Sequence, residues 1–143
     1  MSVVIDLDSV LETLMAGSAI AAVGSDVEHP VVFTPDHSPA LRLACRDALR
    51  RVALQLAPYL DAVRLDCDTP ELVFDSSLRL PEELLGVFVA DTVASHVLHL
   101  MLASSYPSMS AAYAVRAAES LAEIHRCILN AARPQCLKIR PHG

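Results

Sequence analysis

The spacing of apolar positions predicts two helices in the first half of the chain. A Ser-x-x-Glu capping box that begins at Ser9 predicts a helix from Ser9 to Val23, which Gly24 ends. Ser38, followed directly by a proline, predicts the start of a second helix. Apolar residues then recur at steps of three and four, so this helix is expected to continue to about Leu60.

Two further helices are predicted in the second half. The segment Leu84–Ala103 is the most apolar part of the chain, and a proline and two glutamates precede it, as at the start of a helix. Its few polar residues lie near one face, so we expect it to be the central helix. A fourth, amphipathic helix is predicted from Ser110 to Ala132, ended by Pro134.

Between the second and third helices the pattern becomes alternating. The residues Val63–Cys67 are apolar and charged in turn, which is typical of a strand, and Leu72–Leu80 is expected to return as its partner. The polar stretch Ser25–His37 is interpreted as a loop with one short edge strand at Val31–Phe33. The chain is therefore predicted to be mainly α, a four-helix domain with a small β-hairpin between helices 2 and 3.

Length and composition fit one folded domain. The chain has 143 residues, of which 53% are hydrophobic and 20% charged, so it can bury a core and is not intrinsically disordered. We expect a single helical domain over residues 1–143, with flexible ends at 1–8 and 134–143. The net charge of −6 excludes general binding to nucleic acid, because its sign is wrong for attraction to phosphates.

The chain is expected to be cytoplasmic or assembled in a virion. Four cysteines at irregular spacing are typical of a reducing compartment, and the apolar start of the chain lacks the basic residues of a secretory signal. The segment Leu84–Ala103 is long enough to cross a bilayer, but Asp91, His96 and His99 lie inside it. We therefore interpret it as a buried core helix and expect no membrane partner.

Three histidines are the best candidates for a metal site. His96 and His99 are three residues apart and share a helix face, and His125 with Glu123 on the fourth predicted helix could complete a set of ligands. The spacing matches neither H-E-x-x-H nor the E-x-x-H of di-iron bundles. Ordinary core or interface histidines are the favoured interpretation, and no metal or cofactor is predicted.

Other groups of reactive residues also have simpler explanations. Cys45 and Cys127 fall on apolar helix faces and are interpreted as small core residues. The acidic residues around the predicted hairpin lack a calcium-loop motif and are interpreted as a solvated turn; they are Asp66, Asp68, Glu71 and Asp75. A stripe of arginines on the second helix could bind phosphates, although pairing with nearby acids is favoured; it consists of Arg42, Arg46, Arg50 and Arg51.

The order of elements resembles a class of phage proteins. The chain is predicted to begin with a helix, a loop and an amphipathic helix that ends in Ala57-Pro58-Tyr59-Leu60. A hairpin and two long helices follow; Leu80-Pro81 precedes the first of these helices, and Arg133-Pro134 ends the second. This layout resembles small, mostly helical structural proteins of gut-bacterial prophages and, more loosely, the head–tail connector proteins of tailed phages. The resemblance implies a non-enzymatic protein without catalytic residues or cofactors, which assembles into rings or adapts one ring to another.

We therefore expect an assembly protein that associates with itself and with other virion proteins. Residues 1–40 hold six acids and no Lys or Arg, whereas 124–143 hold four basic residues and no acid, which favours head-to-tail contact. Two alternatives remain open at this stage. One is a small metal-binding module or metal-dependent enzyme using His96, His99 and His125. The other is a cytoplasmic adaptor bundle with a different protein partner.

Overall fold

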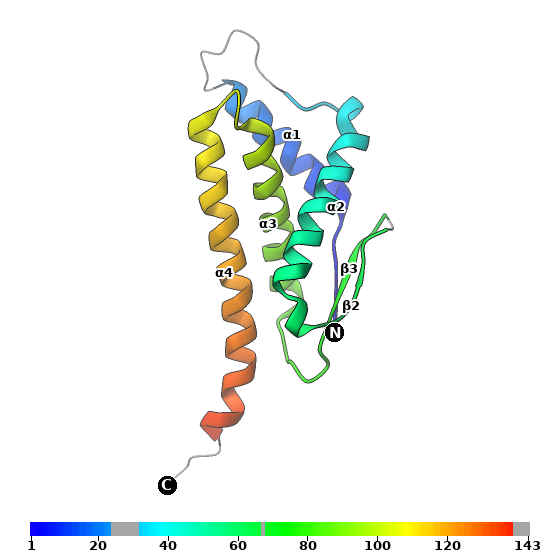
Figure 1. Ribbon diagram of the computed structural model, residues 1–143, viewed down its shortest axis with the longest axis vertical. Coiled ribbons are helices and arrows are strands. Elements are labelled where there is room, and N and C mark those ends of the chain that lie inside the picture. The colour runs from blue at the N-terminus through cyan, green and yellow to red at the C-terminus, as the bar shows by residue number, and fades with distance from the viewer. Residues whose placement is uncertain (24–31, 67, 139–143) are drawn as a thin grey trace.

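The computed structural model describes residues 1–23, 32–66 and 68–138, with 132–138 described by their backbone alone (Figure 1). The fold is mainly α, as predicted. Four helices surround a common core, and a small antiparallel sheet covers one end of it. The helices are α1 (Leu7–Val23), α2 (Ser38–Gln55), α3 (Glu82–Leu102) and α4 (Pro107–Lys138).

The sheet contains a hairpin between helices 2 and 3, as predicted, and one further strand. The hairpin strands start earlier and end earlier than the predicted Val63–Cys67 and Leu72–Leu80. β2 (Leu60–Arg64) and β3 (Glu71–Phe74) pair antiparallel, and β1 (Ser2–Val4) pairs with the other side of β3, so the strand order is β1-β3-β2. Leu72 and Phe74 of β3 are fully buried, whereas most of β2 is exposed. The central strand therefore joins the sheet to the core, and β2 forms an edge.

The expectation of a flexible segment at residues 1–8 is wrong. Val3 and Ile5 are 2% and 1% exposed, and the amide of Ile5 donates to the carbonyl of Pro70 at 2.8 Å. The amide of Phe74 donates to the carbonyl of Met1 at the same distance, 2.8 Å. Three residues are too few for strand periodicity to be evident in the sequence, and the partner strand lies far along the chain.

The first helix begins two residues earlier than the Ser9 capping box predicts. The carboxylate of Asp6 accepts hydrogen bonds from the amide of Asp8 and the hydroxyl of Ser9, both at 3.0 Å. The Ser9 hydroxyl, followed by the backbone amides, holds the pKa of Asp6 below its ordinary value. Asp6 therefore caps α1, because an aspartate at this position satisfies the free amides of the first turn.

The second helix begins at Ser38 as predicted but ends at Gln55 instead of Leu60. A short 3-10 turn at Ala57–Tyr59 follows, and Leu60 already belongs to β2. Val32 and Phe33 do not form the expected edge strand. Instead Phe33 is buried, and its amide donates to the Ser18 hydroxyl of α1 at 2.8 Å. Gly24 and Val31 lie outside the described residues.

Helix α3 is the core helix, as the sequence predicts. It contacts all three other helices and β1, and Figure 1 shows it between α1, α2 and α4. Among the described residues, it is the one helix long and apolar enough to cross a membrane, with a mean hydropathy of 1.6. The core helix of a folded domain has the same composition. Its packing against three helices and β1 accounts for much of its apolar character, although Val87 and Leu100 are 63% and 55% exposed.

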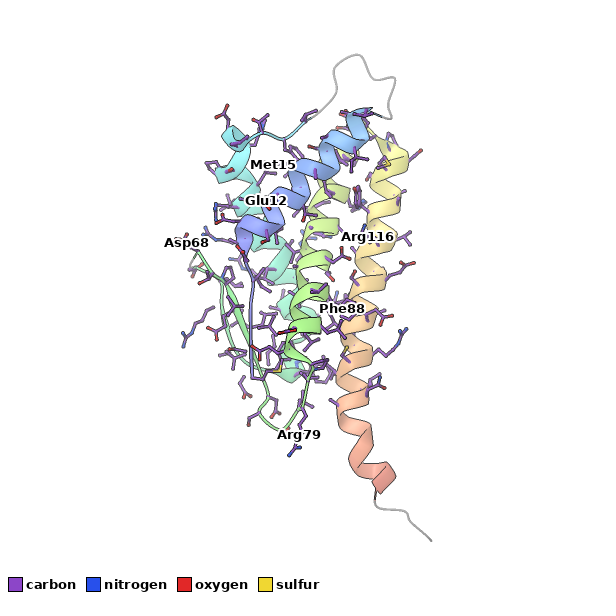
Figure 2. All side chains as sticks on the ribbon, turned by 180° about the vertical axis from the view of Figure 1, so that it is seen from behind. Glu12, Met15, Asp68, Arg79, Phe88 and Arg116 are labelled. Atoms are coloured by element: carbon purple, nitrogen blue, oxygen red, sulfur yellow. The ribbon has the colours of Figure 1, made fainter. Side chains whose placement is uncertain are left out.

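Helix α4 lies antiparallel to α3 and extends beyond it (Figure 2). It begins at Pro107, earlier than the predicted Ser110, and continues past Pro134 to Lys138. Proline is favoured in a first turn, where its missing amide is not needed, and at position 134 it removes one hydrogen bond without ending the helix. The predicted flexible end from 134 is thus helical as far as 138, and 139–143 lie outside the described residues.

A polar cluster joins α3 and α4 on the side away from α2. Asp91 accepts from the Arg116 guanidinium at 2.9 Å and from the hydroxyl of Ser120. Ser120 is buried on α4, while Arg116 is exposed at its edge. This carboxylate, placed within an apolar helix, therefore has both a charged partner and a hydrogen-bond donor on the neighbouring helix.

Candidate binding groove between α2 and α4

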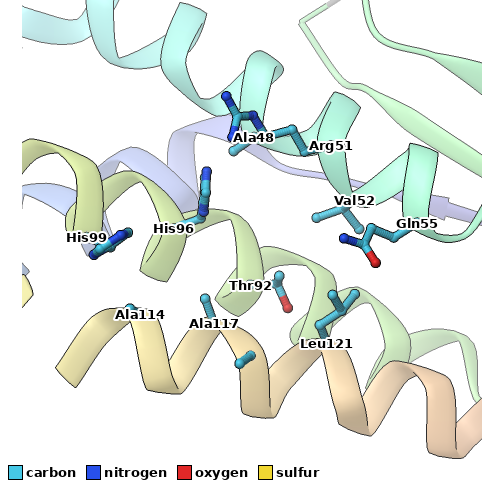
Figure 3. A pocket seen from close by; sticks show the side chains of 11 residues that line it. Ala48, Arg51, Val52, Gln55, Thr92, His96, His99, Ala114, Ala117 and Leu121 are labelled. Carbon is cyan, nitrogen blue, oxygen red and sulfur yellow. The ribbon is translucent and has the colours of Figure 1, made fainter. Parts of the chain in front are cut away.

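A groove of about 370 Å³ lies between α2 and α4, with α3 as its floor (Figure 3). Helices α2 and α4 each pack on α3, and few contacts join α2 directly to α4. The α4 wall consists of small or aliphatic residues, Ala114, Ala117, Ala118 and Leu121. These short side chains do not reach α2, which leaves the groove open.

His96 points from α3 toward α2 in this groove. Its Nε2 atom is buried and has no hydrogen-bond partner among the described residues. Burial lowers the pKa of His96 below its ordinary value, and the nearby charges of Arg51 and His99 lower it further. The ring is therefore neutral at pH 7 and carries an unsatisfied polar atom.

His99 is oriented by the start of α4. Its Nδ1 atom lies 3.1 Å from the carbonyl oxygen of Ser110 and 3.0 Å from the hydroxyl oxygen. The Ser110 hydroxyl itself donates to the carbonyl of His99 at 2.7 Å. Because that proton is already used and a carbonyl only accepts, the Nδ1 atom of His99 carries the ring proton and donates.

The arginine stripe on α2 is largely paired with acids, as favoured from the sequence. Arg42 pairs with Asp8, Arg46 with Asp68 at 4.0 Å, and Arg50 with Asp47 at 3.0 Å. Arg51 differs from these three residues. It lines the groove opposite His96 and forms no ion pair within the part of the chain that the structure describes.

A second surface feature adjoins the groove along α4. Residues at alternating steps of four and three form a mostly apolar line, exposed except at the half-buried His125. We call it the α4 stripe: Ala111, Val115, Ala118, Ala122, His125 and Leu129. Val115 and Leu129 are 58% and 60% exposed. This spacing is that of a coiled-coil seam. The sequence carries this signal, although we did not predict it.

The structure does not bring the three candidate metal-ligating histidines together. The rings of His96 and His99 are 6.4 Å apart, whereas His125 packs against Tyr59, at 6.5 Å. His125 lies about one helical turn beyond Leu121, the groove residue nearest to it on α4. Glu123 pairs with Arg126. No group of three possible metal ligands occurs among the described residues.

The acidic residues of the hairpin mostly have local partners. Asp68 pairs with Arg46, and Glu71 lies 3.9 Å from Arg64. Asp75 accepts from the amide and the hydroxyl of Ser77 at 2.9 and 2.8 Å, which lowers the pKa of Asp75. These contacts agree with a solvated turn.

Of the two cysteines whose side chains are described, Cys45 is buried and Cys127 is half-buried. Burial raises the pKa of Cys45 to about 11 and also raises that of Cys127, so neither thiol is readily ionised. Cys45 is a core residue, as predicted. Cys67 and the side chain of Cys136 lie outside the described parts of the chain.

Comparisons with protein-family models, with curated proteins and with solved structures found no match. The groove and the α4 stripe are therefore the features from which a function can be argued.

Proposed function

We propose that this protein is a non-enzymatic assembly protein that associates with itself through α4. The observation that carries the proposal is the α4 stripe, a line of mostly apolar side chains at coiled-coil spacing. Ala111, Val115, Ala122 and Leu129 are exposed, whereas Ala118 borders the groove and His125 packs against Tyr59. Apolar residues scattered over a surface need no explanation, but an aligned series on one helix is typical of an interaction site.

The length of α4 supports a second copy of this chain as the partner that covers the α4 stripe. Helix α4 has 32 residues and α3 has 21, so α4 is about 48 Å long against about 31 Å. The end of α3 and the start of α4 lie side by side at a short turn, and the last turns of α4 therefore extend past the start of α3 (Figure 1). Leu129 lies near this extension, and a second α4 helix would cover it.

The heptad positions favour an antiparallel pair. When two α4 helices run in opposite directions around a two-fold axis, Ala118 lies opposite Leu129 of the second copy and Ala122 lies opposite its His125. Glu119 of each copy then flanks Arg126 of the other. Alanines let two helices approach closely, and the large and small residues interdigitate. Opposite ends of α4 adjoin, so the pair closes as a dimer and not as a head-to-tail filament.

Sedimentation and light scattering at tens of micromolar test self-association. We expect the unchanged chain to be a dimer and both Ala118→Glu and Leu129→Glu to be monomers, because each buries a carboxylate at the centre of the contact. Ala112→Glu is the matched control, since Ala112 is exposed on the polar side of the same helix. A monomeric unchanged chain, or a dimer that survives both stripe substitutions with native circular dichroism, contradicts the proposal.

The proposal extends to the class of assembly. The element order that resembles prophage structural and connector-like proteins supports a role in a virion, with other virion proteins as further partners. The neighbouring genes provide the test: capsid, portal or tail genes beside this one are expected. A neighbourhood of unrelated metabolic genes would overturn the virion role and leave self-association to be judged by the measurements above.

A further inference from the structure

The groove between α2 and α4 contains a positive charge that no residue of the described chain neutralises in an ion pair. Three arginines of the α2 stripe are held by Asp8, Asp68 and Asp47. Arg51 alone in that stripe lines the groove, and no described residue forms an ion pair with it. A guanidinium presents several N–H donors in a plane, which suits a planar carboxylate.

A second donor lies across the groove from Arg51. The Nε2 atom of His96 is buried and lacks a hydrogen-bond partner in the described structure, although a buried polar atom normally has one. Figure 3 shows the His96 ring extending from α3 toward Arg51 on α2. An acceptor placed between the two side chains would satisfy both of them, with Nε2 of the neutral ring carrying the donated proton.

Apart from Thr92, His99 and Gln55, the remaining side chains that line the groove are alanines and aliphatic residues. Val52 follows Arg51 directly on α2, Leu121 lines the groove from α4, and alanines form much of the remaining walls. A volume of about 370 Å³ is at the lower end of the range for small-molecule pockets. One charged end and one apolar end define an amphipathic ligand, and a single unpaired arginine beside a neutral histidine matches one negative charge.

We propose that the groove binds a small organic carboxylate, with its head group between Arg51 and His96 and a short apolar chain against Val52 and Leu121. The site does not require self-association, because every residue of the groove comes from one copy. Gln55 also lines the apolar end, where its amide can accommodate a polar substituent on the chain.

Calorimetric titration of the intact protein with hexanoate tests the proposal. We expect saturable binding with one site per chain, and no binding of hexylamine or hexan-1-ol, which keep the apolar chain without the negative charge. In two-dimensional NMR spectra, the amide signals that shift with hexanoate should come from the groove-lining parts of α2, α3 and α4.

Substitutions locate the site. Arg51→Gln should weaken hexanoate binding by about tenfold or more, because a charge-assisted hydrogen bond exceeds one tenfold step in affinity. His96→Phe, which keeps a ring of similar shape, should also weaken it. Arg50→Gln is the matched control, since Arg50 is adjacent in sequence but pairs with Asp47. Absence of saturable binding, equal binding of hexylamine, or an equal loss in Arg50→Gln and Arg51→Gln would overturn the proposal.

Discussion

At the scale of single residues, two glycines inside helices have opposite surroundings. A Cβ atom at Gly17 of α1 would lie 2.9 Å from Cδ1 of Leu98 and 3.2 Å from the Tyr113 hydroxyl oxygen. A Cβ atom at Gly86 of α3 would meet only Cγ1 of Val3, at 3.7 Å, which is ordinary contact. Gly17 therefore permits a close approach of α1 to α3, whereas nothing nearby requires a glycine at 86.

This contrast predicts that alanine substitutions at the two positions change the free energy of unfolding in opposite directions. Gly86→Ala should stabilise the fold by about 0.5–1 kcal/mol, the gain in helix propensity. Gly17→Ala gains the same propensity but must displace the buried Leu98, and overpacking costs about 1–3 kcal/mol, so we expect net destabilisation. Urea unfolding of the two variants, compared with the unchanged chain, provides the measurement. A stabilised Gly17→Ala would show that the approach of α1 to α3 is looser than described.

The groove shows which features of single residues could be predicted from the sequence. The pattern singled out His96 and His99 and the arginine stripe, because residue type and helical spacing are local properties. It could not show that Arg51 lies opposite His96. They are on different helices, and only the packing of α2 and α4 on α3 brings them to one groove. The placement of His125 away from the pair depends on the same packing.

At the scale of secondary-structure elements, the strength of the local signal decided which predictions were correct. The third helix was predicted over Leu84–Ala103 and is observed at Glu82–Leu102, because a long apolar run and an acidic start define it. The ends of α1, α2 and α4 were less accurate, since several residues near each end can serve as a cap or a stop. Strand β1 was missed because its pairing with β3 is not local.

Strand β1 leads to a prediction that distinguishes a folded start of the chain from a flexible one. Val3 is 2% exposed and Val4 is 57% exposed, although they are adjacent. Val3→Asp should cost several kcal/mol, because it places an unpaired carboxylate in the core. Val4→Asp changes only the solvent side and should be tolerated. Circular dichroism melting of both variants checks this. Equal melting temperatures would mean that the strand does not pair.

At the scale of the whole molecule, one buried thiol reports on global unfolding. Cys45 is 0% exposed on the core face of α2, and burial raises its pKa to about 11, with Arg42 opposing the shift in part. At pH 8 about one such thiol in a thousand is ionised, whereas a free cysteine is substantially ionised at the same pH. The thiolate is the reactive form, so Cys45 in the folded protein reacts slowly. Labelling of Cys45 therefore requires both exposure and the return of its ordinary pKa.

We expect Cys45 to react with a thiol reagent only when the whole domain unfolds. A variant in which the other three cysteines are serine isolates its signal. The free energy of Cys45 exposure, calculated from the labelling rate, should depend on urea concentration with the same slope as the free energy of global unfolding. Circular dichroism of that variant controls for its fold. Fast labelling without denaturant would mean that α2 opens locally, independently of the other helices.

The pairing of β1 with β3 also sets an order of events in time. Ser2 pairs with Val73, so β1, which is synthesised before β3, cannot pair until β3 has also left the ribosome. Helices α3 and α4, by contrast, are joined by a short turn and meet through contacts close in sequence, which form quickly. Pairing of β1 with β3 closes a long loop, which costs conformational entropy. That cost is offset only when Val3 and Ile5 can be buried in the core. Strand β1 is thus among the last elements to reach its place, and until then the edge of β3 that it covers stays open to pairing with other chains.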